Sequence, residues 1–126
     1  MARVPDRGIP PRNPESVELR RLRKRIDALD RRLVALLNER AELAREAGRA
    51  KHAAGFRAIR DADREREVLL RVTMANEGPL AQADLLAFYK RLMAATRALE
   101  ARDRDRARAE RARAARDGDG GTDDAG

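Results

Sequence analysis

An apolar stripe with heptad spacing runs through the first half of the sequence. Its residues follow one another in alternating steps of four and three, interrupted once by Arg40, and they are Leu22, Ile26, Leu29, Leu33, Leu36, Leu43, Ala47, Ala50 and Ala54. This pattern predicts one continuous helix whose apolar face packs against other helices. With Ser16 as N-cap and Gly55 as the C-terminal stop, the helix would be roughly 58 Å long. A single compact chain of 126 residues is too short to bury the apolar face of so long a helix. The sequence therefore predicts an oligomeric bundle.

Two further helices are predicted downstream. The second begins at Asp61, which suits an N-cap, and carries apolar residues at Val68, Leu69 and Val72. The Asn-Glu-Gly-Pro run at 76–79 then interrupts the chain. The third helix has its stripe, again in steps of four and three, at Leu85, Tyr89, Leu92, Thr96 and Leu99. The predicted fold class is therefore all-α, with three helices of which the first is very long.

The composition restricts the chemistry that the chain can support. Charged residues make up 40% of the sequence and aromatic residues 2%, which is typical of long helices. There is no cysteine and the single histidine is His52, so we expect neither a metal site nor a disulfide framework. Residues 1–14 hold four of the five prolines and are predicted to be an irregular leader. The sequence has no signal peptide and no run near the ~20 apolar residues of a membrane span. We therefore expect a cytoplasmic protein without a membrane partner.

The net charge of +7 raises the possibility of nucleic-acid binding. The segment 101–126 has seven arginines and seven acidic residues, so this end of the chain is neutral. It is predicted to be a charged helical extension that loses its helix in the run DGDGGTDDAG and ends in a disordered tail. A non-enzymatic basic module would also leave Asp61 and Glu65 unexplained and would lack aromatic residues for base stacking. We therefore expect no nucleic-acid partner.

Polar residues occupy several positions at which the apolar stripes would continue with a hydrophobic side chain. They are Arg40 in the first helix, the group Asp61, Arg64 and Glu65 at the start of the second, and Thr96 in the third. Taken singly, each is explained by a structural salt bridge or by the end of a stripe. Taken together they predict a site for an anionic ligand, because a buried arginine without an anionic partner is unfavourable.

Two more basic residues are spaced along the first helix so that they could contribute to this site. Lys51 follows Arg40 by eleven residues, which places it on nearly the same helix face at roughly 16 Å. Arg23 precedes Arg40 by seventeen residues, or roughly 25 Å, so it can join the site only from a second subunit. For both residues an ordinary solvated charge is the alternative. Because no nucleophile, metal-ligand set or phosphate loop accompanies them, the site suits a reaction that needs only orientation and charge stabilisation.

At these residues the sequence resembles the all-helical chorismate mutases. The matching stretches are LRKRIDALD (22–30), LLNERAELAREAGRAK (36–51), RDADRERE (60–67) and, more loosely, FYKRLMAATRALE (88–100). The resemblance implies an intertwined homodimer of three-helix chains, with residues 15–100 as the mutase domain. It also implies a cofactor-free Claisen rearrangement of chorismate to prephenate, an isomerase reaction of the shikimate pathway of aromatic amino-acid biosynthesis.

The resemblance also implies roles for the cations. Arg40, together with Arg23 of the partner subunit, would clamp the two carboxylates of chorismate, since a guanidinium matches a planar carboxylate. Lys51 would donate to the ether oxygen, where negative charge develops as the C–O bond breaks.

The remaining site residues follow from the same resemblance. Asp61 and Glu65 would hold the ring hydroxyl, Arg64 would support the cationic side of the pocket, and Thr96 stands where the family usually has serine. Glu100 stands where the family usually has a glutamine that donates to the ether oxygen. A carboxyl group donates only when it is protonated, so we expect activity to rise toward mildly acidic pH. The alternative for Glu100 is a surface residue on a fraying helix.

A related reaction on the same scaffold is the release of pyruvate from isochorismate by a lyase. Such lyases resemble the mutases in the first helix but tend to lack the arrangement seen here at Asp61, Arg64 and Glu65. The presence of these three residues therefore favours the mutase.

Overall fold

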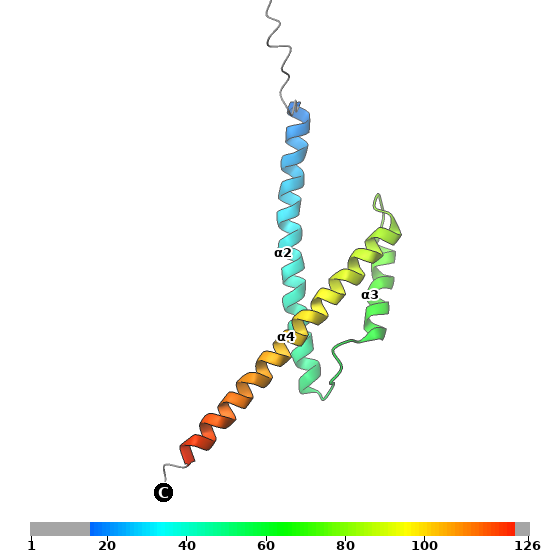
Figure 1. Cartoon of the computed structure of the whole chain (residues 1–126). Helices are drawn as coiled ribbons and strands as arrows, with labels where there is room; N and C mark the ends of the chain where they lie inside the picture. The colour runs from blue at the N-terminus through cyan, green and yellow to red at the C-terminus, as the bar shows by residue number, and fades with distance from the viewer. Residues whose placement is uncertain (1–15, 123–126) are drawn as a thin grey trace, which may run out of the picture. The chain divides into compact units, whose positions relative to one another are not determined.

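The computed structural model describes residues 16–122, which are almost entirely helical. Within this range it contains α2 (Val17–Ala53), α3 (Ala62–Ala75) and α4 (Gln82–Thr122), with no strand between residues 16 and 122 (Figure 1). The prediction of an all-α chain with a long first helix is confirmed. The expected leader at 1–14 and residues 123–126 of the expected tail lie outside the described residues. The chain divides into a first unit that ends at Arg40 and a second that begins at Ala41.

The predicted start of α2 is confirmed. The backbone N–H of Leu19 donates to Oγ of Ser16 at 3.0 Å, and the backbone N–H of Arg20 donates to the Ser16 carbonyl at 3.0 Å. Ser16 therefore satisfies one of the donors that a helix leaves unpaired in its first turn. This local bond explains why a serine two residues after a proline begins the helix.

The predicted end of α2 is confirmed as well. Gly55 has a positive φ of 97°, a conformation that glycine adopts without steric penalty. The N–H of Phe56 donates to the carbonyl of Lys51 at 2.9 Å, and the N–H of Gly55 donates to the carbonyl of His52 at 3.1 Å. This pair of bonds is a Schellman motif. It places Lys51 in the last turn of α2.

The apolar stripe of the first unit is exposed in the single chain. Ile26, Leu29 and Leu36 are 54%, 58% and 55% exposed. These residues share one face of α2, and nothing within residues 16–40 covers that face. A contiguous apolar surface of this kind marks an interaction site.

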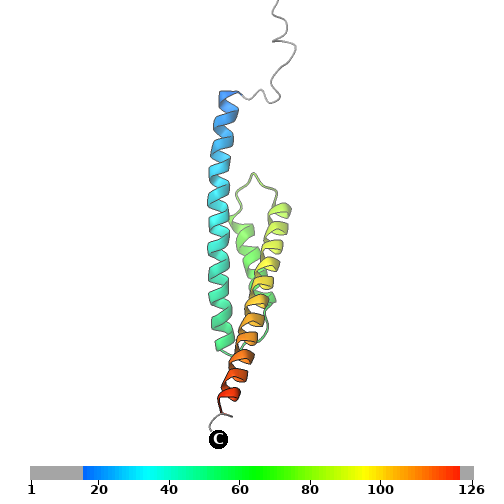
Figure 2. The ribbon, with the colours of Figure 1, turned by 60° about the vertical axis from the view of Figure 1, so that its left-hand side comes forward.

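In the second unit, α3 and α4 form an antiparallel helical hairpin (Figures 1 and 2). The connection between them is closed by Asn76, whose Nδ2 donates to the Leu80 carbonyl at 3.1 Å and to Oε1 of Gln82 at 2.9 Å. The N–H of Gly78 donates to Oδ1 of the same asparagine at 3.0 Å. The predicted break at 76–79 is therefore a turn organised by one side chain. Among the described residues of this unit, Met93 of α4 is the buried large apolar side chain, at 6% exposure.

The helix α4 extends further than the sequence pattern predicted. The pattern ended it in the Asp-Gly run that begins at residue 117, whereas the structure continues it to Thr122. The segment before this run is rich in alanine and arginine, both strong helix formers. Extending an existing helix is far easier than nucleating one, and each interior glycine costs only about 1 kcal/mol. The helix therefore persists for between one and two more turns through these glycines.

Candidate functional site

The end of α2 and the middle of α4 approach closely at Gly48 and Glu100. Glu100 is 9% exposed and Gly48 is buried. A Cβ at position 48 would lie 3.3 Å from Cδ of Glu100 and 3.5 Å from its Oε2. The absence of a side chain on α2 therefore makes room for the glutamate. Glycine at this position carried no signal in the sequence, because its neighbour is 52 residues away along the chain.

The environment of Glu100 favours its neutral form. Burial raises the pKa of the Glu100 carboxyl, while the positive charges of Lys51 and Arg104 lower this pKa and the charge of Asp103 raises it. Oε2 of Glu100 is buried and has no hydrogen-bond partner in the described part of the chain. The alternative of a surface residue on a fraying helix is wrong, since Glu100 is buried well inside α4. A buried acid with a raised pKa can serve as a hydrogen-bond donor.

Lys51 contributes positive charge to the surroundings of Glu100. It is half-buried in the last turn of α2, and its ammonium group is close enough to lower the pKa of the Glu100 carboxyl. Both residues belong to the second unit, and their joint action on one substrate oxygen stays a prediction. Thr96 is also half-buried and lies one turn before Glu100, with Oγ1 donating to the Leu92 carbonyl at 3.0 Å.

Glu65 of α3 is held by arginines from two directions. Its side chain is 18% exposed, Oε2 pairs with Nη1 of Arg97, and Oε1 lies 3.4 Å from Nε of Arg60. Arg97 comes from α4 and ties it to the start of α3. Our sequence reasoning missed Arg97, although it immediately follows Thr96 and so flanks the stripe of α4.

Asp61 and Arg64 lie at the exposed start of α3. Oδ1 of Asp61 accepts from the backbone N–H of Arg64 at 3.0 Å, which confirms the predicted N-cap. The Arg64 side chain is 58% exposed, and its Nη1 lies 3.2 Å from Oε1 of Glu67. Neither residue is buried in the single chain, although both continue the apolar stripe of α3. Their predicted contact with substrate stays a prediction.

The two remaining predicted residues, Arg23 and Arg40, belong to the first unit. Arg23 is exposed and Arg40 is half-buried on α2. Their roles in a shared site also stay predictions.

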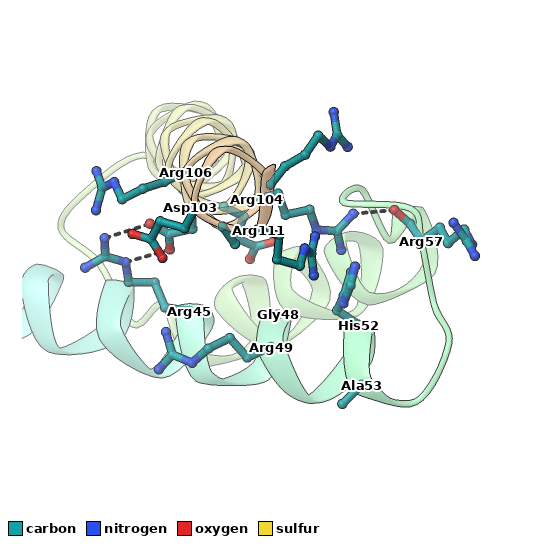
Figure 3. Close-up of a pocket in the computed structure, with 14 residues that line it drawn as sticks. Arg45, Gly48, Arg49, His52, Ala53, Arg57, Asp103, Arg104, Arg106 and Arg111 are labelled. Atoms are coloured by element: carbon teal, nitrogen blue, oxygen red, sulfur yellow. Dashed lines mark hydrogen bonds and ion pairs between the residues drawn. The ribbon is translucent and has the colours of Figure 1, made fainter. Parts of the chain in front are cut away.

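An open cavity of about 780 Å³ lies beside Glu100, between the end of α2, the loop that follows it, and α4 (Figure 3). Glu100 is the one residue of the predicted site among those that line it. At one end Arg45 forms a bidentate ion pair with Asp103, through Nε and Nη2 at 2.9 Å each. This hydrogen bonding holds the pKa of the Asp103 carboxyl below its usual range and raises that of Arg45. The pair joins residues 58 positions apart and was not foreseen from the sequence.

Residues 16–122 contain no cluster of three or more histidine, cysteine or acidic side chains that could hold a metal ion. No helix in the same range is both long and apolar enough to cross a bilayer.

Comparison with known proteins assigns a family to this architecture. The family described as chorismate mutase type II matches residues 22–101. The bifunctional chorismate mutase/prephenate dehydratase of Stutzerimonas stutzeri is 36% identical over 90 residues, which cover 68% of this chain and 25% of that protein. The bifunctional enzyme of the same description from Escherichia coli strain K12 is 55% identical over 51 residues, covering 40% of this chain and 13% of that protein. This chain therefore spans about a quarter or less of the length of these two relatives.

A solved structure agrees with the sequence comparison. The structure of chorismate mutase (form II) from Thermus thermophilus superposes with a TM-score of 0.64 at 33% identity. The alignment covers 68% of this chain and 96% of that one. The part of α4 after residue 101 lies beyond the segment that matches the family.

Proposed function

We propose that this chain, which belongs to the chorismate mutase type II family, converts chorismate to prephenate by an intramolecular Claisen rearrangement. The observation that carries the proposal is the buried Glu100, whose carboxyl has a pKa raised by burial and is acted on by the positive charge of Lys51. An acid and a cation placed together suit a single oxygen that becomes negative during the reaction. The family assignment and the fold of the Thermus thermophilus enzyme support the same reaction.

The proposed mechanism uses Lys51 and Glu100 as two donors to the ether oxygen of the substrate. As the C–O bond breaks, this oxygen gains negative charge, and donors that are already in place stabilise the transition state more than the ground state. The ammonium group of Lys51 donates at neutral pH. Glu100 donates in its neutral form, which burial against α2 favours. The reaction then needs no cofactor and no covalent intermediate.

We assign the binding of the two substrate carboxylates to Arg40 and to Arg23 of the partner subunit. Bidentate pairing with two guanidinium groups would hold the flexible substrate in its compact reactive conformation. The homodimer that this requires is supported by the exposed apolar stripe of α2, which a second copy would cover. The expected cytoplasmic location stays a prediction.

We assign the ring hydroxyl of the substrate to Asp61 and Glu65. Glu65 is already oriented by Arg97 and Arg60, so its carboxylate would be presented without further ordering. Arg64 would add positive charge at the same end of the site. Thr96 would offer a hydroxyl one turn before Glu100.

The direct test is to incubate the purified chain with chorismate and to follow the loss of chorismate absorbance and the formation of prephenate. Isochorismate serves as the second substrate. Prephenate from chorismate supports the mutase, whereas pyruvate from isochorismate alone would assign the chain to the lyase alternative. Salt-dependent binding of duplex DNA with neither reaction would instead favour a basic binding module.

The shared site can be tested by mixing two inactive variants. Arg23→Ala and Lys51→Ala remove residues that would come from opposite subunits of one site. Unfolding and refolding them together should restore about one quarter of the wild-type sites, because half of the dimers are mixed and each mixed dimer has one intact site. A mixture that stays inactive while remaining dimeric would show that Arg23 and Lys51 do not meet across subunits.

A further inference from the structure

We propose that the cavity between the end of α2 and α4 is a second binding site, for a small phosphate-bearing anion with at least two negative charges. The inference concerns the α4 extension and does not depend on the proposed mutase activity. It rests on the charge of the cavity, on one buried arginine atom and on the position of the cavity in the chain.

Positive charge dominates the lining of the cavity. Seven of the residues that line it are arginines and three are acidic, an excess of four positive charges, or seven less three. Asp103 is already engaged by Arg45. Arg49 and Arg106 lie near this pair, at the same end of the cavity (Figure 3). Cations gathered around one hollow repel one another, and a multiply charged anion would relieve that repulsion.

Arg104 provides the specific donor. Its Nη1 donates to the backbone carbonyl of Arg57, at the end of the cavity opposite the Arg45–Asp103 pair (Figure 3). Its Nη2 is buried and has no hydrogen-bond partner among the described residues. A buried guanidinium N–H without an acceptor is unfavourable. Arg104 lines the cavity, so a turn of its guanidinium toward an oxyanion bound there would give Nη2 an acceptor through a charge-assisted hydrogen bond.

The walls of the cavity are held in place before any ligand binds. The Arg45–Asp103 pair joins α2 to α4 at one end, and Arg104 joins α4 to the loop after α2 at the other (Figure 3). A volume of about 780 Å³ is adequate for a small metabolite. Phosphate fits better than a single carboxylate because its three terminal oxygens can accept from more than one arginine at once.

Half of the residues that line the cavity lie beyond the segment that matches the family. The residues that α4 contributes, apart from Glu100, lie between positions 103 and 111, beyond the matched segment 22–101. The site would therefore need the part of α4 beyond the matched segment as well as residues within that segment. Since Glu100 lines the cavity as well, an anion bound there would lie close to the proposed reaction site.

The test is calorimetric titration of the full chain with pyrophosphate at low ionic strength. We expect one saturable site per chain, and Arg104→Gln should weaken binding by about tenfold through loss of the charge-assisted bond. The matched control is Arg102→Gln, which removes the same charge from an exposed position of α4 that does not line the cavity. It should bind pyrophosphate as the wild type does. Circular dichroism verifies that both variants remain helical.

Several outcomes would overturn the proposal. Absence of saturable binding would do so, and so would equal weakening in Arg102→Gln, which would indicate non-specific attraction to a basic helix. Succinate, a dianion without phosphate, should bind at least several-fold more weakly than pyrophosphate; equal binding would refute the phosphate assignment. If Arg104→Gln dissociates a dimer that the wild type forms, the cavity is a contact between subunits and not a ligand site.

Discussion

Gly48 and Glu100 are in close contact where α2 meets α4: a Cβ on residue 48 would lie 3.3 Å from Cδ of the glutamate. This separation is tighter than an ordinary side-chain contact, so any larger residue at position 48 must displace the carboxyl group. Gly48 is thus a positioning residue for Glu100, and the relationship makes the proposed mechanism testable from a residue that carries no functional group.

Replacement of Gly48 by alanine should lower activity without unfolding the chain. A displaced Glu100 would misalign its hydrogen bond to the substrate, and we expect kcat/KM to fall by about tenfold. Alanine is the better helix former by about 1 kcal/mol, so the Tm should not decrease. Gly118→Ala is the matched control, because position 118 is open space within 4 Å. A Gly48→Ala enzyme with unchanged kinetics would remove Gly48 from the mechanism.

The activity should rise as the pH falls from neutral toward mildly acidic values. Burial raises the pKa of the Glu100 carboxyl, and the donating neutral form is lost as the pH rises through that pKa. Glu100→Gln places an amide donor there at every pH, so its kcat/KM should be nearly flat between about pH 5 and 8. Glu46→Gln, on the exposed surface of α2, should keep the wild-type profile. A wild-type profile that is already flat contradicts the proposed role.

Glu100 should also make the thermal stability of the chain depend on pH. Because the folded pKa of Glu100 is raised, its stabilising contribution is complete below the unfolded pKa of about 4.3 and is lost as the pH rises through the folded pKa. Glu100→Gln should therefore have a higher Tm than the wild type at neutral pH, and the two values should converge near pH 4. Thermal melts across this range measure the difference. A variant that is less stable than the wild type at neutral pH would mean that Lys51 and Arg104 outweigh the burial.

Lys51 and Arg40 should differ in how their removal affects the kinetics. Lys51→Ala should reduce kcat far more than it raises KM, because its bond to the ether oxygen strengthens only in the transition state. Arg40→Ala should impair both parameters, because the carboxylate that it is assigned is present in substrate and transition state alike. Steady-state kinetics with chorismate separate the two patterns. Equal losses in both parameters for Lys51→Ala would assign it to binding alone.

The Arg45–Asp103 pair should stabilise the junction of α2 and α4 at neutral pH and lose this effect in acid. The pKa of Asp103 is lowered by its hydrogen bonds from Arg45, so its contribution is present above the unfolded pKa of about 3.9 and is lost as the pH falls through the folded value. Asp103→Asn should lower the Tm at neutral pH and have little effect in strong acid. Asp105→Asn, on the exposed side of the same helix, is the control. Equal effects of the two substitutions would mean that the pair adds nothing beyond surface charge.

Local sequence patterns were sufficient to predict most of the helix boundaries of this protein. The ends of α2 at Ser16 and Gly55 and the cap of α3 at Asp61 depend on hydrogen bonds that span five residues or fewer, so a sequence pattern reveals them. The periodic stripes likewise predicted the three helices. The expectation that Lys51 and Glu100 act on one substrate oxygen came from a family resemblance and stays a prediction, and the charge of Lys51 does act on the Glu100 carboxyl.

Other features required the packed chain. Neither the pair of Arg97 with Glu65 nor that of Arg45 with Asp103 has a local signature, because the partners are 32 and 58 residues apart. Gly48 looked like any helical glycine until α4 was seen to pack Glu100 against it. Helix boundaries follow from neighbours along the chain, whereas burial, and with it the pKa of Glu100, depends on which distant helix excludes the water. The sequence therefore identified Glu100 as a candidate acid. Only tertiary packing determined that the neutral form of its carboxyl is favoured.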